Sequence, residues 1–435
     1  MDKRQIFSSN LATLVTMIGV SVGLGNVWRF PYMMGKYGGS AFLLVYLTFT
    51  LFFAIPALMA EWALGRETRS GPLGAFSIVF GKIPGFILGS ILLITVTIAD
   101  SYYIVVIANV ANTAFFSIFT GFTNANLTDF QLQLSNGWLQ YVISMVVLIC
   151  SLYVVYKGLK KGIEVISKIF VPFFSIVIVY LIFYTFSLEG ATEQFAQFLR
   201  PDFNAINSEV LFAALGQAFF SLGLGGTFLL IYGSYLKDQQ NIPQGAIIIG
   251  LGDMGAAIFA SMFIVPAILV YGLDMAAGPS LLFNTLPELF AQMPAGRLTG
   301  SLFLIALVMV AFLSNIAALE VVAGSFNDFN VPKLSRNRVI IILGAIEAIL
   351  ILPSSLYPNL IGYLDLIFGS GMQTLGSGFA IVALIWGFGR NKAMTQIFKQ
   401  SKSVWVNLYY YWAKWVVPLA LLIILITYIY DSFIL

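Results

Sequence analysis

Two apolar segments of this chain are interrupted by glycine and polar residues. The segment "GVSVGLGNVWRFPY", residues 19–32, contains three glycines, an asparagine, an arginine and a proline, and "SLGLGG", residues 221–226, repeats part of it. Backbone groups that leave a helix at membrane depth need partners, and an ion or polar solute can supply them. Freed N–H groups favour a carboxylate, and freed carbonyls favour a cation. Close helix packing is the alternative role for a single Gly-x-Gly, but two matched copies favour binding.

The composition indicates the elements that position these groups. Hydrophobic residues make up 59% of the 435 residues and charged residues 9%, which is typical of a polytopic membrane protein. A spanning helix needs about 20 predominantly apolar residues. The sequence predicts eleven such spans, near 11–36, 41–65, 84–119, 138–156, 163–187, 208–236, 243–273, 296–327, 338–353, 358–388 and 404–431. We therefore expect a single transmembrane domain over residues 1–435.

Several other classes of function lack the residues that they need. Cys150 is the only cysteine and histidine is absent, so a disulfide, a Cys/His zinc site and a Cys–His catalytic pair are excluded. The net charge of +3 is spread along short loops, which argues against nucleic-acid binding. No paired catalytic carboxylates share a motif, and no nucleophile elbow is present, so we do not expect an enzyme. The first span is too long and interrupted for a cleaved signal peptide.

The basic residues predict the orientation in the membrane. Seventeen of the 22 Lys and Arg residues fall in loops that the eleven spans place on one side, which is the cytoplasmic side. We expect a multi-pass protein of the bacterial inner (plasma) membrane, with its N-terminus cytoplasmic and its C-terminus outside. The interrupted apolar piece 276–296 is interpreted as a re-entrant or surface hairpin on the outside.

The two glycine-rich copies also predict internal symmetry. They lie five spans apart, so they enter the bilayer from opposite sides. This relation predicts inverted repeats over about 11–187 and 208–388, followed by an extra span at 404–431. Paired interrupted segments in corresponding positions of two repeats indicate the binding site of a transporter.

Longer motifs make the chain resemble a known family. "VGLGNVWRFP" followed by "GGSAF", "EWALGR" at 61–66, "SYY" at 101–103 and "GQAFFSLGLG" at 216–225 are similar to the neurotransmitter:sodium symporters, specifically the bacterial amino acid transporters with eleven spans. The resemblance covers essentially the whole chain. It implies an all-α polytopic fold with a 5+5 inverted repeat and broken helices one and six.

The resemblance also implies a site for an amino acid. The substrate carboxylate would bind the N–H groups of Leu24 and Gly25 and the hydroxyl of Tyr103. Its ammonium would bind carbonyls near Ser21 and Phe220, with help from Ser221. The expected substrate-binding residues are Ser21, Leu24, Gly25, Ala99, Tyr103, Phe220, Ser221, Gly223, Gly226, Ser314 and Ala318.

The first sodium site implied by the resemblance uses the Ser21 carbonyl and the side chains of Asn26, Ser221 and Asp253, together with the substrate carboxylate. Hard oxygen ligands suit a hard cation. Asp253 supplies a fixed negative charge, so we expect no chloride requirement. Asp253 is also one of two candidate proton carriers.

The second sodium site departs from the family pattern. Its expected positions are Gly19, Val22, Val310 and Ser314, but Leu313 stands where an oxygen-bearing side chain is usual. Leucine cannot coordinate sodium, so we expect this site to be weak or lost. A one-residue slip of the alignment would instead bring Ser314 and Asn315 into place.

Gates are implied on both sides of the site. Arg29 and Asp365 would form the outer gate, with Tyr103 and Phe220 as its lid. The inner gate would consist of Arg4, Ser234, Tyr235 and Asp328. A solvated helix end is the alternative role for Arg4 and for Asp328.

Asp100, directly before "SYY", is a further departure from the family pattern. An ionisable residue at membrane depth is costly and functional by default. Burial disfavours the charged form of a carboxyl, so Asp100 is the other candidate proton carrier. A structural hydrogen bond to a neighbouring helix is the alternative. Glu61 belongs to a family motif and is assigned a packing role, and Glu347 ranks low because it lies outside the repeat core.

The small residues Ala99, Gly223, Gly226 and Ala318, opposite Phe220, predict a large apolar pocket unless neighbouring side chains fill it. A large apolar ligand recovers the burial at roughly 25 cal/mol per Å². We expect an aromatic amino acid, with tryptophan first.

The sequence therefore predicts a symporter of hydrophobic amino acids that works by alternating access, with spans one, two, six and seven moving against the rest. Its coupling ion is a proton, or sodium at a single site. No other cofactor is expected, and the protein is a monomer or weak dimer in the lipid bilayer. The alternative function is a non-transporting amino acid sensor on the same fold.

Overall fold

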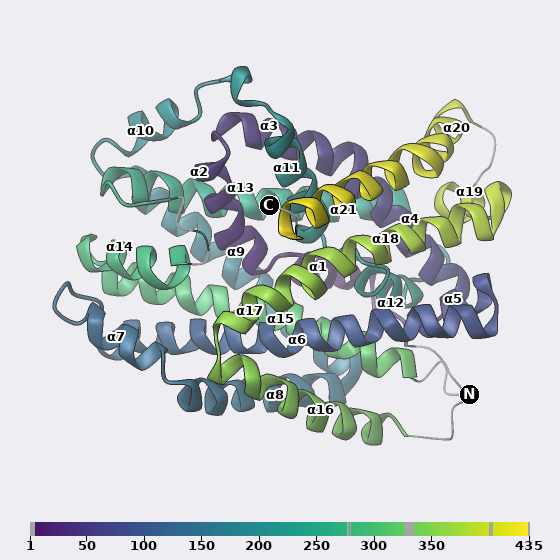
Figure 1. Cartoon of the computed structure of the whole chain (residues 1–435), viewed down its shortest axis with the longest axis horizontal. Coiled ribbons are helices and arrows are strands. Elements are labelled where there is room, and N and C mark those ends of the chain that lie inside the picture. The colour runs from purple at the N-terminus through teal and green to yellow at the C-terminus, as the bar shows by residue number, and fades with distance from the viewer. Residues whose placement is uncertain (1–4, 276–277, 279, 327–334, 400–402, 434–435) are drawn as a thin grey trace.

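The computed structural model describes residues 5–275, 278, 280–326, 335–399 and 403–433. Within these ranges the regular structure is helical throughout (Figure 1). Helices, some of them interrupted, cover the predicted spans. They are α1 (Asn10–Ser21) with η1 (Gly25–Arg29) and α2 (Phe30–Lys36), α3 (Ser40–Phe49) with η2 (Thr50–Ala54) and α4 (Ile55–Thr68), α6 (Lys82–Phe119), α8 (Gly137–Gly158), α9 (Glu164–Phe186), α11 (Ser208–Ser221) with α12 (Phe228–Ser234), α13 (Ile242–Val270), α15 (Gly296–Phe326), α16 (Arg336–Leu356), α17 (Asn359–Leu364) with η6 (Asp365–Gly371), α18 (Met372–Val382) and η7 (Ala383–Gly387), and α20 (Val404–Tyr411) with η8 (Trp412–Val416) and α21 (Val417–Phe433).

Among the described residues, eight helical stretches and one bent pair are long and apolar enough to cross a membrane. One of the eight, 137–186, joins the predicted fourth and fifth spans, and the predicted sixth span is divided between two short helices. The chain is thus a helical protein with several apolar spans. The count of eleven stays a prediction.

Shorter helices connect these elements. They are α5 (Pro72–Phe80), α7 (Leu127–Leu134), α10 (Ala191–Phe198), η3 (Leu159–Ile163), η4 (Phe203–Ala205), η5 (Leu281–Thr285), α14 (Leu286–Gln292) and α19 (Gly389–Phe398). The predicted hairpin at 276–296 contains η5 and α14, but residues 276, 277 and 279 lie outside the described residues.

Both glycine-rich segments interrupt their helices. The chain leaves α1 after Ser21 and resumes at Gly25, and the two pieces are bent by 56°. It leaves α11 after Ser221 and resumes at Phe228, through Gly223 and Gly226, which both have a φ of +65°. Residues other than glycine rarely adopt a positive φ. The glycines of this segment therefore allow the chain to leave the helix here. The breaks in the first and sixth predicted spans therefore exist as expected.

The basic loops meet at one end of the molecule. Arg66 donates to the carbonyl of Gln240 (2.7 Å) and Lys392 pairs with Glu67 (2.6 Å). Lys237 donates to the carbonyl of Ser8 (2.9 Å). These contacts join the N-terminal segment to the loops after the second, sixth and tenth predicted spans. The charge pattern predicted that the loops share a side, and the contacts agree; which side faces the cytoplasm stays a prediction.

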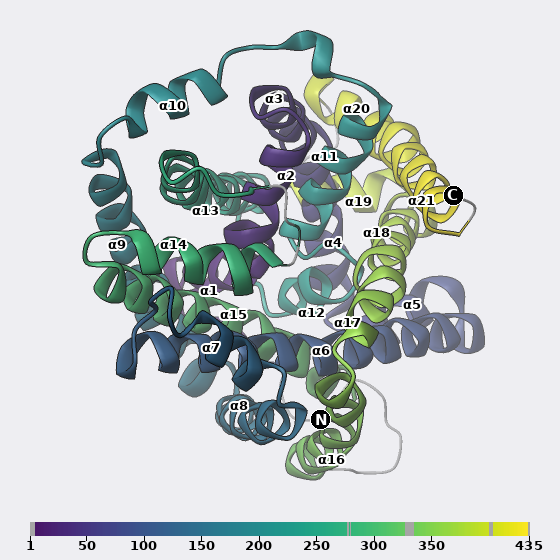
Figure 2. The same cartoon turned by 60° about the vertical axis from the view of Figure 1, so that its left-hand side comes forward.

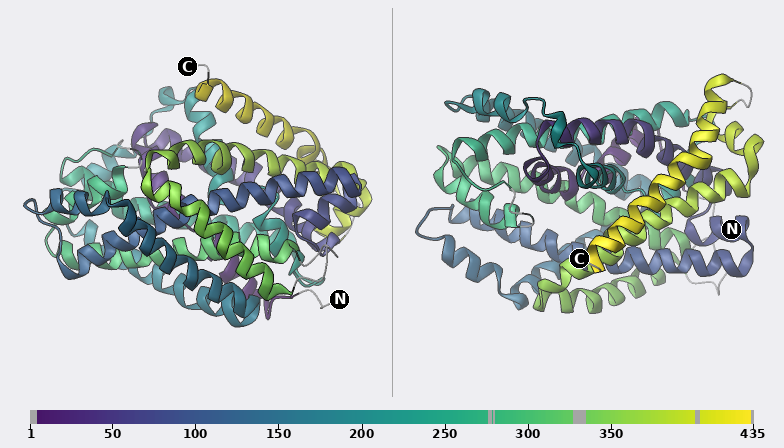
Figure 3. Two further views of the ribbon diagram at one scale, coloured as in Figure 1. Left: turned by 60° about the horizontal axis from the view of Figure 1, so that its bottom comes forward. Right: turned by 45° about the horizontal axis from the view of Figure 1, so that its top comes forward.

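Helices α6 and α15 pack against each other beside α1, and α8 and α16 lie together on their far side (Figures 2 and 3). The outward faces of these outer helices carry exposed apolar side chains such as Ile149 on α8 and Ile341 on α16. An apolar exterior suits contact with lipid. Cys150, the only cysteine of the chain, lies exposed on α8.

Candidate binding site at the helix breaks

Three polar side chains from three helices meet where α1 is interrupted. The Asn26 amide nitrogen donates to the Ser221 hydroxyl (2.8 Å) and to the Asp253 carboxylate (2.7 Å), and Ser221 donates to the other carboxylate oxygen (2.8 Å). All three side chains are buried, and Asp253 is fully so. The sequence predicted this group as the first sodium site, and the fold brings its members together.

Side chains that the sequence analysis did not assign support this group. Gln217 donates to the carbonyl of Gly25 (3.0 Å) in the resumed part of the first helix. Tyr46 of α3 is fully buried beside Asp253. The Ser21 hydroxyl donates to the Met17 carbonyl (3.0 Å) within its own helix. The Ser21 hydroxyl is thus engaged within α1, and the binding of an ion by the Ser21 carbonyl stays a prediction.

Three buried, oxygen-bearing side chains suit a hard monovalent cation. The Asn26 amide oxygen accepts from the Gly23 N–H (3.0 Å), while its nitrogen points at Ser221 and Asp253. The oxygen and nitrogen of an amide are assigned from their partners, so a rotated Asn26 would present its oxygen to an ion. The negative charge of Asp253 balances that of the cation.

The predicted carboxylate-binding groups also converge. The Leu24 N–H donates to the Tyr103 hydroxyl at 3.5 Å. A side chain at Gly23 would meet that hydroxyl at 3.2 Å and the Ser314 hydroxyl at 2.9 Å. The ring of Phe220 would similarly meet one at Gly25, at 2.9 Å. The glycines of the first break thus allow Tyr103, Ser314 and Phe220 to approach its backbone.

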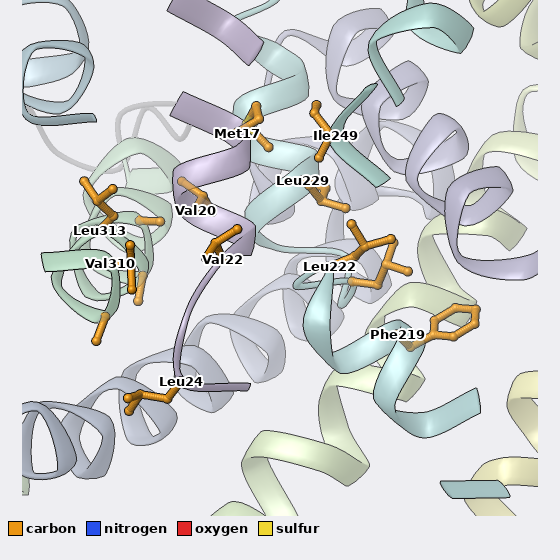
Figure 4. Packing of buried hydrophobic residues seen from close by; sticks show 14 of the residues in the cluster. Met17, Val20, Val22, Leu24, Phe219, Leu222, Leu229, Ile249, Val310 and Leu313 are labelled. Atoms are coloured by element: carbon orange, nitrogen blue, oxygen red, sulfur yellow. The ribbon is translucent and has the colours of Figure 1, made fainter. Parts of the chain in front are cut away.

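The register of α15 on α1 is the one without the slip. Ser314 donates to the carbonyl of Val20 (3.1 Å), whereas Asn315 points away from α1 to Asp100 (2.8 Å). The Leu313 side chain lies 2.8 Å from where a Cβ at Gly19 would stand. Figure 4 shows Leu313 and Val310 beside Val20 and Val22. Leucine carbon therefore lies beside Gly19, as the alignment without the slip requires, and the loss of the second sodium site stays a prediction.

The four small pocket residues differ in what they face. Ala99 and Ala318 are buried, and open space lies beside Gly223. A side chain at Gly226 would come within 2.5 Å of the Gly376 carbonyl of α18. Gly226 therefore allows two backbones to come close, and its place in the pocket wall stays a prediction.

Glu61 has a local structural task at the second break. Its carboxylate is fully buried on α4 and accepts from the Gly225 N–H (3.1 Å). A buried backbone N–H released from a helix needs an acceptor. The packing role predicted for Glu61 is thus more specific, because this carboxylate satisfies the interrupted backbone.

At the predicted outer gate, Arg29 and Asp365 do not form an ion pair. The Arg29 guanidinium lies over the Phe220 ring, 4.4 Å from its centroid. Asp365 instead accepts from the Tyr102 hydroxyl (3.0 Å). The predicted contact is therefore corrected for this conformation: each partner has another contact. A cavity of about 360 Å³, lined by Arg29, Phe219 and Phe220 among others, opens here.

The predicted inner gate is described in part, because Arg4 and Asp328 lie outside the described residues. The Tyr235 hydroxyl donates to Glu320 (2.6 Å), and Glu320 pairs with Arg336 (2.5 Å). Ser234 donates to the Ile231 carbonyl (2.5 Å). Buried Phe7 stacks on Tyr232, with ring centroids 6.1 Å apart, and also contacts the Tyr235 ring. Phe7, Glu320 and Arg336 were not predicted as parts of this gate.

Comparison with known proteins now identifies the family. The model of the sodium:neurotransmitter symporter family matches residues 4–136 and 132–433, nearly the whole chain. The chain belongs to the sodium:neurotransmitter symporter family.

Solved and curated members of this family support the assignment over the full length. The crystal structure of MhsT in complex with L-phenylalanine is similar, with a TM-score of 0.88 at 31% identity, covering 98% of this chain and 100% of that one. An uncharacterised sodium-dependent transporter of Methanocaldococcus jannaschii is 32% identical over 93% of this chain and 86% of its own length. One of Haemophilus influenzae is 28% identical over 98% of both chains.

Family membership establishes a sodium-coupled membrane transporter and confirms the resemblance drawn from the motifs. This family consists of transporters, which agrees with the expectation that the chain is not an enzyme. The roles of single residues in this symporter stay predictions.

Proposed function

We propose that this symporter couples the uptake of a hydrophobic, aromatic amino acid to one sodium ion. The observation that carries the proposal is the meeting of Asn26, Ser221 and Asp253 at the two helix breaks. These side chains and the Ser21 carbonyl would hold the ion. The ion supplies positive charge beside the substrate carboxylate, so substrate and sodium stabilise each other's binding.

The amino acid would sit between the breaks. The N–H groups of Leu24 and Gly25 and the hydroxyl of Tyr103 would bind its carboxylate. The ammonium group would bind carbonyls near Ser21 and Phe220, with Ser221. Open space beside Gly223, next to buried Ala99 and Ala318, supports a large side chain, with tryptophan first. The relative MhsT was solved with L-phenylalanine, which agrees with an aromatic substrate.

A single sodium site is proposed because the second lacks ligands. Gly19, Val22 and Val310 offer only carbonyls, Ser314 bonds to Val20, and Leu313 fills the space with carbon. A proton carried by Asp100 or Asp253 is the remaining way to add a second driving ion. Asp253 already lies in the sodium site, and its fixed charge makes chloride unnecessary.

Transport would proceed by alternating access. Spans one, two, six and seven would move against the other helices, within two inverted repeats at about 11–187 and 208–388. In the present conformation Phe7 is buried at the inner end, while the outer cavity reaches Arg29 and Phe220. Closing of the outer side would bring Arg29 and Asp365 together. We place the protein in the bacterial plasma membrane, N-terminus inside and C-terminus outside, as a monomer or weak dimer.

Uptake of radiolabelled tryptophan into proteoliposomes tests the proposal. An inward sodium gradient and an inward proton gradient are applied separately and together. We expect sodium alone to drive accumulation, and phenylalanine and tyrosine to compete better than alanine. Saturable binding without accumulation under any gradient would overturn the proposal in favour of the sensor, and accumulation driven by protons without sodium would overturn its coupling.

A further inference from the structure

Glu347 carries a carboxyl group that belongs to neither the proposed sodium site nor the proposed substrate site. It lies on α16, is fully buried, and both of its oxygens lack a hydrogen-bond partner among the described residues. Helix α16 packs on α6, α8 and α15, away from the two breaks (Figure 2). A buried carboxyl without a partner is costly, so its presence requires an explanation.

A second buried carboxyl lies on α6, one of the helices on which α16 packs. Asp100 of α6 accepts from the Asn315 amide of α15 (2.8 Å), and its other oxygen has no partner among the residues described. The amide oxygen of Asn315 accepts in turn from Ser151 of α8. Glu347 lies at the middle of α16, which packs on α6, the helix that carries Asp100. We call Asp100, Asn315, Ser151 and Glu347 the scaffold cluster.

The cations on the helices around the scaffold cluster are exposed or engaged elsewhere. Lys82, at the start of α6, and Arg338, near the start of α16, are exposed. Arg336, at the start of α16, pairs with Glu320. Arg297, at the start of α15, donates to the carbonyls of Ile118 (2.5 Å) and Phe119 (3.1 Å). Lys157, at the end of α8, lies 5.1 Å from the centre of the Tyr153 ring.

The tyrosine and cysteine side chains of these helices either have hydrogen-bond partners of their own or are exposed at the surface. Tyr141 of α8 donates to the Ala348 carbonyl (3.2 Å), and Tyr103 of α6 faces Leu24. Tyr102 of α6 donates to Asp365, and Cys150 of α8 is exposed. The chain contains no histidine. No described cation is therefore placed to neutralise two ionised carboxylates in this low-dielectric interior.

We propose that Asp100 and Glu347 together form a proton-binding site in the scaffold of this transporter, separate from the sodium site. A proton from solution binds a carboxylate oxygen and leaves it again as a proton, so the step needs no other reactant. Two neighbouring carboxyls share their protons as a pair. Three of their four oxygens have no hydrogen-bond partner within the described part of the chain, so they can carry the hydrogen or accept it.

The scaffold cluster is connected to the substrate site through two short paths, and this part of the inference rests on the proposed function. Asn315 directly follows Ser314, which donates to Val20 beside the first break. Asp100 precedes Tyr103 by about one helical turn, so both lie on one side of α6. Proton binding at the cluster therefore shifts the groups that receive the amino acid carboxylate.

Infrared difference spectra of the purified protein in nanodiscs, recorded on lowering the pH at constant sodium, test proton binding directly. We expect a protonated-carboxyl band worth about one proton per protein, which is lost in Asp100→Asn and in Glu347→Gln. Ser354→Ala is the matched control, because Ser354 is a buried polar residue two turns along α16. It should keep the band. If Glu347→Gln does not fold, Glu347→Leu takes its place.

Tryptophan binding at saturating sodium gives the second readout. Between about pH 5 and pH 8 no histidine titrates in this chain. We expect the wild-type affinity to change by about fivefold or more over this range, and the affinity of Glu347→Gln to stay constant.

A band that survives both carboxyl substitutions would overturn the proposal. So would a wild-type band that sodium displaces, since the cluster would then be a cation site. The infrared measurement requires no transport, so a failed uptake experiment and a failed proton site remain distinguishable.

Discussion

At the scale of single residues, the site depends on a few side chains whose partners come from distant parts of the chain. Asn26, Ser221 and Asp253 were predictable because each lies in or near a recognisable motif, and they do meet. Tyr102 at Asp365 and Arg336 at Glu320 were not predicted. Their pairing depends on how helices cross, which short motifs do not specify.

Removing the negative charge of Asp253 tests the role of this residue in the proposed sodium site. Asp253→Asn keeps the shape and one oxygen but removes the charge that balances the ion. We expect the sodium concentration for half-maximal tryptophan binding to rise by about tenfold or more, since bonds to charged groups contribute about 1.5–3 kcal/mol. Ser261→Ala, on the same helix, is the control. An unchanged sodium dependence would place the ion elsewhere.

Restoring an oxygen tests the second sodium site. Leu313→Thr puts a hydroxyl beside Gly19. Leu313→Val introduces a side chain of nearly the same shape as threonine but without the hydroxyl. Both should lose about 1–3 kcal/mol of packing. We expect only the threonine variant to show a steeper sodium dependence of tryptophan binding. Equal curves for the two variants would mean that more than this hydroxyl is missing.

At the scale of elements, the breaks in the first and sixth spans followed from the sequence, because glycine clusters in an apolar stretch end a helix. What each glycine faces did not follow. Gly223 borders open space, whereas Gly226 meets the backbone of α18, although the two stand three residues apart with the same φ. Which atoms a side chain at each glycine would meet depends on where α18 packs, and no local sequence pattern encodes that packing.

This difference between glycines gives a prediction. Gly226→Ala adds a methyl 2.5 Å from the Gly376 carbonyl at a φ of +65°, so we expect loss of folded protein and of transport. Gly216→Ala, inside α11 with open space around it, should be tolerated and can gain up to about 1 kcal/mol. Size-exclusion profiles and melting temperatures compare them. Equal stability would show that α18 moves aside easily.

At the scale of the whole molecule, the described helices form an apolar exterior around a largely apolar core that encloses a smaller set of buried polar groups, and contacts among segments far apart in sequence join one end. The basic loops predicted to share a side do meet. The packing of Phe7 against Tyr232 and Tyr235 was not predicted, because Phe7 precedes the first span and belongs to no motif. Its buried position is a property of the assembled bundle.

Opening of the inner end should therefore respond to Phe7. Phe7→Ala removes packing worth about 3–5 kcal/mol in a core, and even 1.4 kcal/mol of bias shifts two conformations tenfold. With Cys150→Ser as background, a cysteine replacing buried Thr16 on α1 reports opening. We expect faster thiol labelling in Phe7→Ala. Phe203→Ala, at an exposed position of η4, is the control, and equal rates in both variants would show that Phe7 does not hold the inner end closed.

The single cysteine has a practical consequence for following these movements. Cys150 is exposed on α8, in the part of the molecule that the proposed motion leaves at rest. A fluorophore or spin label attached there requires no mutagenesis and no removal of competing thiols. Paired with a second label on α2 or α11, it would act as a fixed reference mark, from which the travel of the mobile helices can be measured molecule by molecule.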